Sequence, residues 1–139
     1  MLVATGDSGD AGEDGGANPQ NVTNHLGKIL RVQPATGAVQ VVALGVRNVQ
    51  RLTIDPNAGN PLLVFTDIGG WVAEELNSVP VADLVSGPPQ NFGWGRSADG
   101  FAREGTSYID TSGAVVGSAP VPEAGFRQPV AQFGRGTAT

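Results

Sequence analysis

Residues 28–44 read KILRVQPATGAVQVVAL, and this stretch decides the fold class. Apolar and polar residues alternate along 28–32, which is the pattern of a half-buried strand. Pro34 and Gly37 suit a tight turn, because proline presets φ and glycine tolerates a positive φ. Residues 39–44 return as a second strand. The stretch therefore predicts a β-hairpin in a protein built from short strands.

Strand-like segments continue on both sides of this hairpin, separated by turn-forming residues. The run 62–66 is apolar almost throughout, so we expect it to be buried on both faces. Residues 71–79 fit a strand or a short helical turn leading into one. Strands at this spacing indicate a sandwich, barrel or propeller. The other expected strands are 1–5, 51–54, 91–95, 108–110 and 114–116.

The composition supports an all-β domain and excludes several partners. Of 139 residues, 21 are glycine and 10 are proline, which disfavour helices, while 40% are apolar and suffice for a core. The net charge is −5 with only 8 scattered Lys and Arg, so we expect no nucleic-acid partner. No apolar run reaches the ~20 residues of a membrane helix, so we expect no membrane association. Cysteine is absent, which excludes disulfides and thiolate metal sites.

Six short strings occur in a fixed order along residues 1–95. They are GDSGD (6–10), LGKILRV (26–32), GVRN (45–48), TDIG (66–69), EELN (74–77) and NFGW (91–94). In this order they resemble the middle of the soluble quinoprotein glucose/sorbosone dehydrogenases, also called aldose sugar dehydrogenases. Residues 96–139 match poorly, and we expect a loop-rich connection toward the next blade there, with an entry near 129–133.

The resemblance implies a fold, a reaction and a location. It implies a six-bladed β-propeller of four-stranded antiparallel blades, with pyrroloquinoline quinone (PQQ) and Ca²⁺ on its axis. It also implies oxidation of the C1 hydroxyl of a small-molecule aldose by hydride transfer to the quinone. The family is periplasmic or secreted, and because Met1 opens directly on a strand-like segment we expect the natural N-terminus to lie upstream.

The length predicts an incomplete ring. Blades take ~40–50 residues, so the 139 residues hold about two to three, and we expect residues 1–139 to be one fragment of a single propeller domain. An open arc exposes the edges of its blades, which favours self-association.

The resemblance assigns cofactor contacts to Arg47, Asn48, Asp7 and Ser8. Arg47 and Asn48 match the family's pair that contacts the quinone, and a guanidinium fork suits a carboxylate or quinone oxygen. Asp7 and Ser8 lie in the turn that faces the cofactor, although Ser8 is shorter than the Gln found there in some members. Alternatively, Arg47 tethers a carboxylate at a blade turn.

The resemblance places Ca²⁺ at the turn that follows the run 62–66. The backbone carbonyls of Gly69 and Gly70, with Asp67, match the turn that coordinates the ion, and calcium prefers oxygen ligands. Family members often have proline in place of Gly70. The alternative is an ordinary turn that ends a strand.

The acidic loop and the single histidine are expected to have no part in catalysis. The loop that contains Asp10, Glu13 and Asp14 fits no EF-hand, so we expect it to be solvated. His25 is the single histidine and is expected at the surface or in a cap.

The aromatic residues of the family-like region are expected in the core: Trp71, Phe92 and Trp94. The resemblance places the catalytic base outside this chain. We therefore expect the chain alone to be inactive toward glucose.

Two other interpretations remain open from the sequence. A propeller that kept its scaffold without the chemistry would bind a glycan or a protein. An unrelated β-sandwich adhesin domain would form a closed monomer without open edges.

Overall fold

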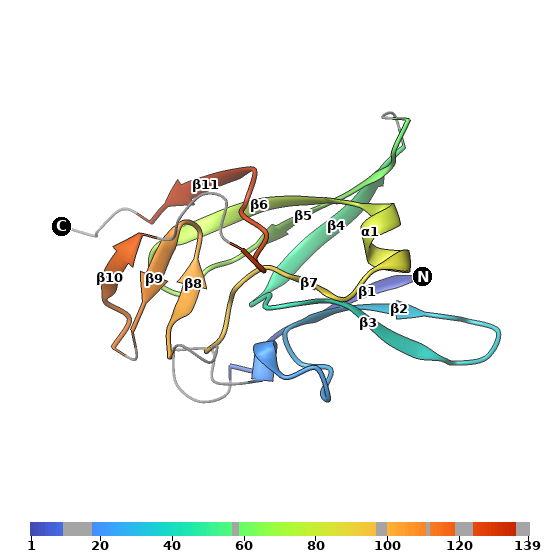
Figure 1. The fold of residues 1–139 in the computed structure, drawn as a ribbon, viewed down its shortest axis with the longest axis horizontal. Helices are drawn as coiled ribbons and strands as arrows, with labels where there is room; N and C mark the ends of the chain where they lie inside the picture. Colours follow the sequence, from blue (N-terminus) through green and yellow to red (C-terminus); the bar gives the residue numbers. More distant parts are fainter. Residues whose placement is uncertain (10–17, 57–58, 97–99, 111, 119–123, 136–139) are drawn as a thin grey trace.

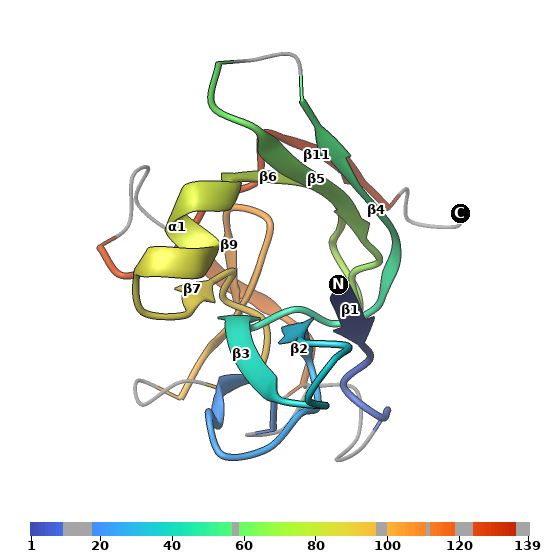
Figure 2. The same ribbon diagram turned by 90° about the vertical axis from the view of Figure 1, so that its right-hand side faces the viewer.

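The computed structural model describes residues 1–9, 18–56, 59–96, 100–110, 112–118 and 124–135. In these ranges the chain forms three β-sheets, one short helix and one 3-10 turn, η2 (Asn18–Gln20) (Figures 1 and 2). The predicted all-β class is confirmed.

Sheet A contains the hairpin from which the fold was predicted. Its strand β2 (Lys28–Val32) pairs antiparallel with β1 (Leu2–Thr5) on one side and with β3 (Val39–Leu44) on the other. Strand β7 (Gln90–Asn91) adds to β3 in parallel orientation. The two strands of the hairpin have the predicted bounds, but the expected half-buried alternation in β2 was wrong, because Lys28, Ile29 and Leu30 are all buried.

Sheet B is a four-stranded antiparallel sheet. Strands β4 (Val49–Asp55), β5 (Leu62–Asp67) and β6 (Ala73–Pro80) form a meander. Two of them cover the strands expected at 51–54 and 62–66, and β6 decides the open choice at 71–79 in favour of a strand. The fourth strand, β11 (Ala131–Gly134), comes from far along the chain and pairs with β6. The segment expected to enter the next blade thus returns to this sheet.

Sheet C lies in the region expected to be a loop-rich connection. It is a small antiparallel meander of β8 (Ala102–Glu104), β9 (Ser107–Ile109) and β10 (Val115–Ser118). Strands β9 and β10 fall within one or two residues of the two predicted short strands, whereas β8 and β11 carry no alternation long enough to reveal them.

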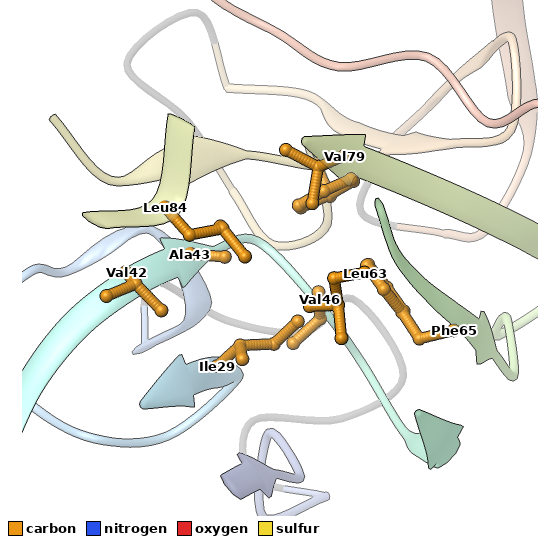
Figure 3. Close-up of a cluster of buried hydrophobic side chains, with 9 residues drawn as sticks. Ile29, Val42, Ala43, Val46, Leu63, Phe65, Val79 and Leu84 are labelled. Carbon is orange, nitrogen blue, oxygen red and sulfur yellow. The ribbon is translucent and has the colours of Figure 1, made fainter. Parts of the chain in front are cut away.

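The hydrophobic core lies between sheets A and B (Figure 3). Helix α1 (Val81–Ser86) contributes Leu84, and the ring of Phe92 meets Phe65 edge to face at 4.9 Å. The predicted core position of Phe92 is therefore confirmed. The buried cluster consists of Ile29, Val42, Ala43, Val46, Leu63, Phe65, Val79, Leu84 and Phe92.

Two further local predictions were wrong. In β5 only one face is fully buried, because Leu63 and Phe65 face the core whereas Thr66 is exposed. The expected strand 91–95 ends almost at once, since Gly93 and Gly95 adopt φ of +95° and +85°, which no extended strand accommodates.

The sheets end in open edges. In the part of the chain that the structure describes, six strands each pair with one strand only: β1, β4, β7, β8, β10 and β11. This arrangement does not meet the requirement of the β-sandwich alternative for a closed domain without open edges.

Candidate cofactor site

Two turns that are distant in sequence meet beside sheet A. The turn at residues 6–9 follows β1, and the turn at residues 45–48 joins β3 to β4. The backbone N–H of Asp7 donates to the carbonyl of Arg47 at 2.9 Å, which holds the turns together. Between them lies a hollow of about 310 Å³, lined by Gly6, Asp7, Ser8, Gly9, Arg47 and Asn48.

The side chain of Asp67 holds the turn at residues 45–48 in place through two hydrogen bonds. Its Oδ2 accepts the backbone N–H of Arg47 at 2.9 Å, and its Oδ1 accepts that of Asn48 at 2.6 Å. Burial, with a smaller effect from the Glu75 charge, raises the pKa of Asp67 to about 7. The carboxyl group is turned toward the backbone rather than toward a ligand.

The Arg47 side chain spans from the hollow to the loop after β5. Its Nη1 donates to the carbonyls of Ile68 at 3.1 Å and Gly69 at 2.9 Å, and its guanidinium lies 5.5 Å from the centre of the Trp94 ring. Among the described residues, no acceptor is bonded to its Nε or Nη2, which leaves donors for an anionic group.

Trp94 joins the two sides of the hollow. Its Nε1–H donates to Asp7 Oδ2 at 3.0 Å, while its ring lies against Arg47. Trp94 is buried, as the sequence predicts, and its hydrogen bond to Asp7 adds a site contact that sequence reasoning missed. The family-like string NFGW (91–94), which contains Trp94, was the sequence feature that could have pointed to this contact.

Ser8 holds a strained conformation at the rim of the hollow. Its φ is +77°, the one positive φ outside glycine among the described residues. The adjacent Asp7 Oδ1 accepts the N–H of Gly9 at 3.0 Å, which closes the turn. Such strain costs on the order of 1–3 kcal/mol and clusters at functional sites.

The structure thus brings all seven predicted site residues into one neighbourhood. Asp7, Ser8, Arg47 and Asn48 line the hollow, and Asp67, Gly69 and Gly70 lie behind Arg47. The hollow carries one carboxylate and one guanidinium. It can pair an anionic oxygen with Arg47 and offer the Asn48 amide as a further donor.

The carbonyls expected to hold Ca²⁺ already accept hydrogen bonds from cations. Gly69 accepts from Arg47, and Gly70 accepts from Arg135 Nη1 at 2.9 Å. Asp67 is occupied by two backbone donors. A calcium ion at these carbonyls would lie beside two guanidinium groups, whose positive charge opposes a divalent cation, and the calcium assignment stays a prediction.

Gly69 has a structural role independent of any metal. A Cβ there would meet the carbonyl oxygen of Ala73 at 1.9 Å and Glu104 Oε1 at 2.2 Å. At Gly70 a Cβ would meet the Trp94 ring at 2.8 Å. Close packing therefore requires glycine at both positions.

The other chemically suggestive residues of the sequence lie away from the hollow or outside the described residues. His25 is exposed, as expected, and its carbonyl accepts a hydrogen bond from Thr5 Oγ1. Asp10, Glu13 and Asp14 lie outside the described residues. In the described ranges no three His, Cys, Asp or Glu side chains gather as a metal site requires, and no helix there is long and apolar enough to span a bilayer.

A second hollow of about 290 Å³ lies beside β7. It is lined by Pro88, Pro89, Gln90, Asn91, Gly125, Phe126 and Arg127. Arg127 is engaged there by Gln90 and by Asp83, and Arg103 stacks over the Phe126 ring at 4.0 Å. Its charged and amide groups are satisfied internally.

Comparison of the chain with family models, with curated proteins and with solved structures gave no match.

Proposed function

We propose that the hollow between residues 6–9 and 45–48 is part of a quinone-binding site, in a PQQ-dependent sugar dehydrogenase-like propeller. One observation carries this proposal. All four residues chosen from two sequence strings, Asp7 and Ser8 from 6–10 and Arg47 and Asn48 from 45–48, line a single hollow. In the proposal, sheets A and B are blades of the incomplete ring, and the protein acts in the periplasm or outside the cell.

The side chains present fit an anionic quinone. PQQ carries carboxylates and an ortho-quinone, and when bound it would accept the hydride from C1 of the sugar. Arg47 Nε and Nη2 can donate to a carboxylate or quinone oxygen. The Asn48 amide can donate alongside, since its Oδ1 accepts from Gln50 at 2.8 Å and no described residue accepts from its nitrogen.

A second candidate function, binding without catalysis, is equally compatible with the described lining of the hollow, since the dehydrogenase proposal expects its base outside this chain. No imidazole lines the hollow, and each oxygen of Asp7 already accepts a hydrogen bond. A module that binds a glycan or protein without catalysis would need neither a base nor a cofactor. The two candidates differ in whether PQQ binds.

The test is a titration of the chain with PQQ alone, followed by tryptophan fluorescence. Trp94 touches both Asp7 and Arg47, so its emission reports on the hollow. We expect Arg47→Ala to bind PQQ about 10- to 100-fold more weakly, the effect of losing a charge-assisted hydrogen bond. Dye-linked glucose oxidation is expected to stay absent in both proteins.

The matched control is Arg31→Ala, because Arg31 is an exposed arginine on β2. Its affinity for PQQ should equal that of the unmodified chain, and circular dichroism should show that both variants are folded. Equal affinity in Arg47→Ala, or no binding of PQQ by the unmodified chain, would overturn the quinone proposal and favour the binding module.

A further inference from the structure

The longest open edge in the described part of the chain belongs to β4. This strand has seven residues, whereas the other strands with an open edge have at most four. Figures 1 and 2 show β4 at the margin of sheet B, with β5 on one side only. It contains no proline or lysine, two residues that protect edges; its charged residues are Arg51 and Asp55, and its pairing with β5 shifts register between Val49 and Arg51.

The sequence of β4 is complementary to itself when reversed. Successive side chains alternate between faces, so Arg51, Thr53 and Asp55 share one face while Leu52 and Ile54 share the other. Leu52 packs against the core, and Ile54 remains 49% exposed. Arg51 and Asp55 stand symmetrically about Thr53 and carry opposite charges.

We propose that β4 pairs antiparallel with β4 of a second copy of this chain, about a two-fold axis at Thr53. Arg51 of each copy then lies opposite Asp55 of the other, and Leu52 lies opposite Ile54. Two-fold symmetry makes every such pair occur twice. The pairing also gives hydrogen-bond partners to the open backbone edge.

Charge matching selects this register. A shift of the axis by one residue places either Arg51 opposite Thr53 or Thr53 opposite Asp55. Both shifts lose the ion pairs between Arg51 and Asp55, and facing pairs are the unit of sheet stabilisation. The contact is short, so a concentration-dependent dimer is expected rather than a permanent one.

The test uses charge exchange across the axis. Light scattering over a dilution series should show the unmodified chain approach twice its 14.1 kDa mass. Arg51→Asp and Asp55→Arg should each dimerise at least about 10-fold more weakly, because like charges then face each other. A mixture of these two variants should recover dimers, since the reversed charge at position 51 of one variant faces the reversed charge at position 55 of the other, and the native Asp55 faces the native Arg51.

Misfolding cannot produce that recovery, and thermal unfolding of each variant checks its fold independently. Arg31→Asp, at the exposed position of β2, is the matched control and should leave dimerisation unchanged. Should Asp55→Arg fail to fold, Thr53→Lys replaces it, because it sets two lysines against each other on the axis. A monomeric unmodified chain, dimers that persist in Arg51→Asp, or no recovery on mixing would each overturn the proposal.

Discussion

Several buried ionisable side chains in this protein form hydrogen bonds with backbone groups. Lys28 is fully buried, and its Nζ donates to the carbonyls of Asn18 at 2.8 Å and Pro19 at 3.0 Å. Burial lowers its pKa to about 8. Asp67 likewise binds backbone, because its carboxyl oxygens accept the N–H groups of Arg47 and Asn48. Lys28 thereby holds the segment at Asn18 and Pro19, and Asp67 holds the turn that lines the candidate site.

Gly69 gives a prediction at this scale. Gly69→Ala should destabilise the fold by about 3 kcal/mol or more, because its Cβ would clash with the Ala73 carbonyl oxygen, which cannot swing away. Chemical denaturation measures the loss. Gly134→Ala, where a Cβ meets nothing within 4 Å, should change stability by less than about 0.5 kcal/mol. Equal stabilities in the two variants would contradict the packing requirement at Gly69.

At the scale of elements, two glutamates join sheets B and C. Glu104 of β8 accepts the backbone N–H groups of Trp71, Val72 and Ala73 at 2.8–3.0 Å. In the other direction, Glu75 of β6 accepts the N–H of Gly105 at 2.5 Å. The small sheet C, too short for independent stability, is thus attached to sheet B by carboxylate-to-backbone bonds.

Glu104→Gln should loosen this joint. A neutral amide oxygen accepts more weakly and its NH₂ group faces donors, so we expect a loss of roughly 1.5–3 kcal/mol. Hydrogen exchange at the amides of residues 71–73 should speed up more than exchange in β5. Glu74→Gln, with a side chain 38% exposed, is the control and should cost under about 1 kcal/mol. Unchanged exchange at residues 71–73 would refute the role of Glu104.

For the whole molecule, buried acids make stability depend on pH. Burial raises the pKa of Asp67 from 3.8 to about 7, and burial raises that of Glu75 as well. A raised pKa means that the folded chain binds protons more tightly than the unfolded chain. This stabilisation is complete below the unfolded value and is lost as pH rises through the folded value.

The free energy of unfolding should therefore fall between pH 4 and pH 7 by up to roughly 4 kcal/mol through Asp67. Asp67→Asn cannot ionise and resembles the protonated acid, so it should lose this part of the dependence. Urea unfolding across that pH range measures the difference between the two proteins. Asp83→Asn, at a side chain 41% exposed, should keep the native profile. A constant difference between Asp67→Asn and the unmodified chain would argue against the raised pKa.

Local sequence determined the strands whose pattern is local. The alternation and turn residues of 28–44 and the run after Asn60 gave β2, β3 and β5 within a residue, because strand pairing across a short turn depends on neighbours in the chain. The resemblance also selected the residues that line the hollow. The structure brings them together.

Only the tertiary structure decided which distant segments meet. The return of β11 to β6, the hydrogen bond from Trp94 to Asp7 and the burial of Glu104 under residues 71–73 all join positions 30 or more residues apart. No local pattern records such pairings, because they depend on the free energy of burying the whole core. For the same reason, the sequence could not show that the carbonyls of Gly69 and Gly70 accept hydrogen bonds from Arg47 and Arg135.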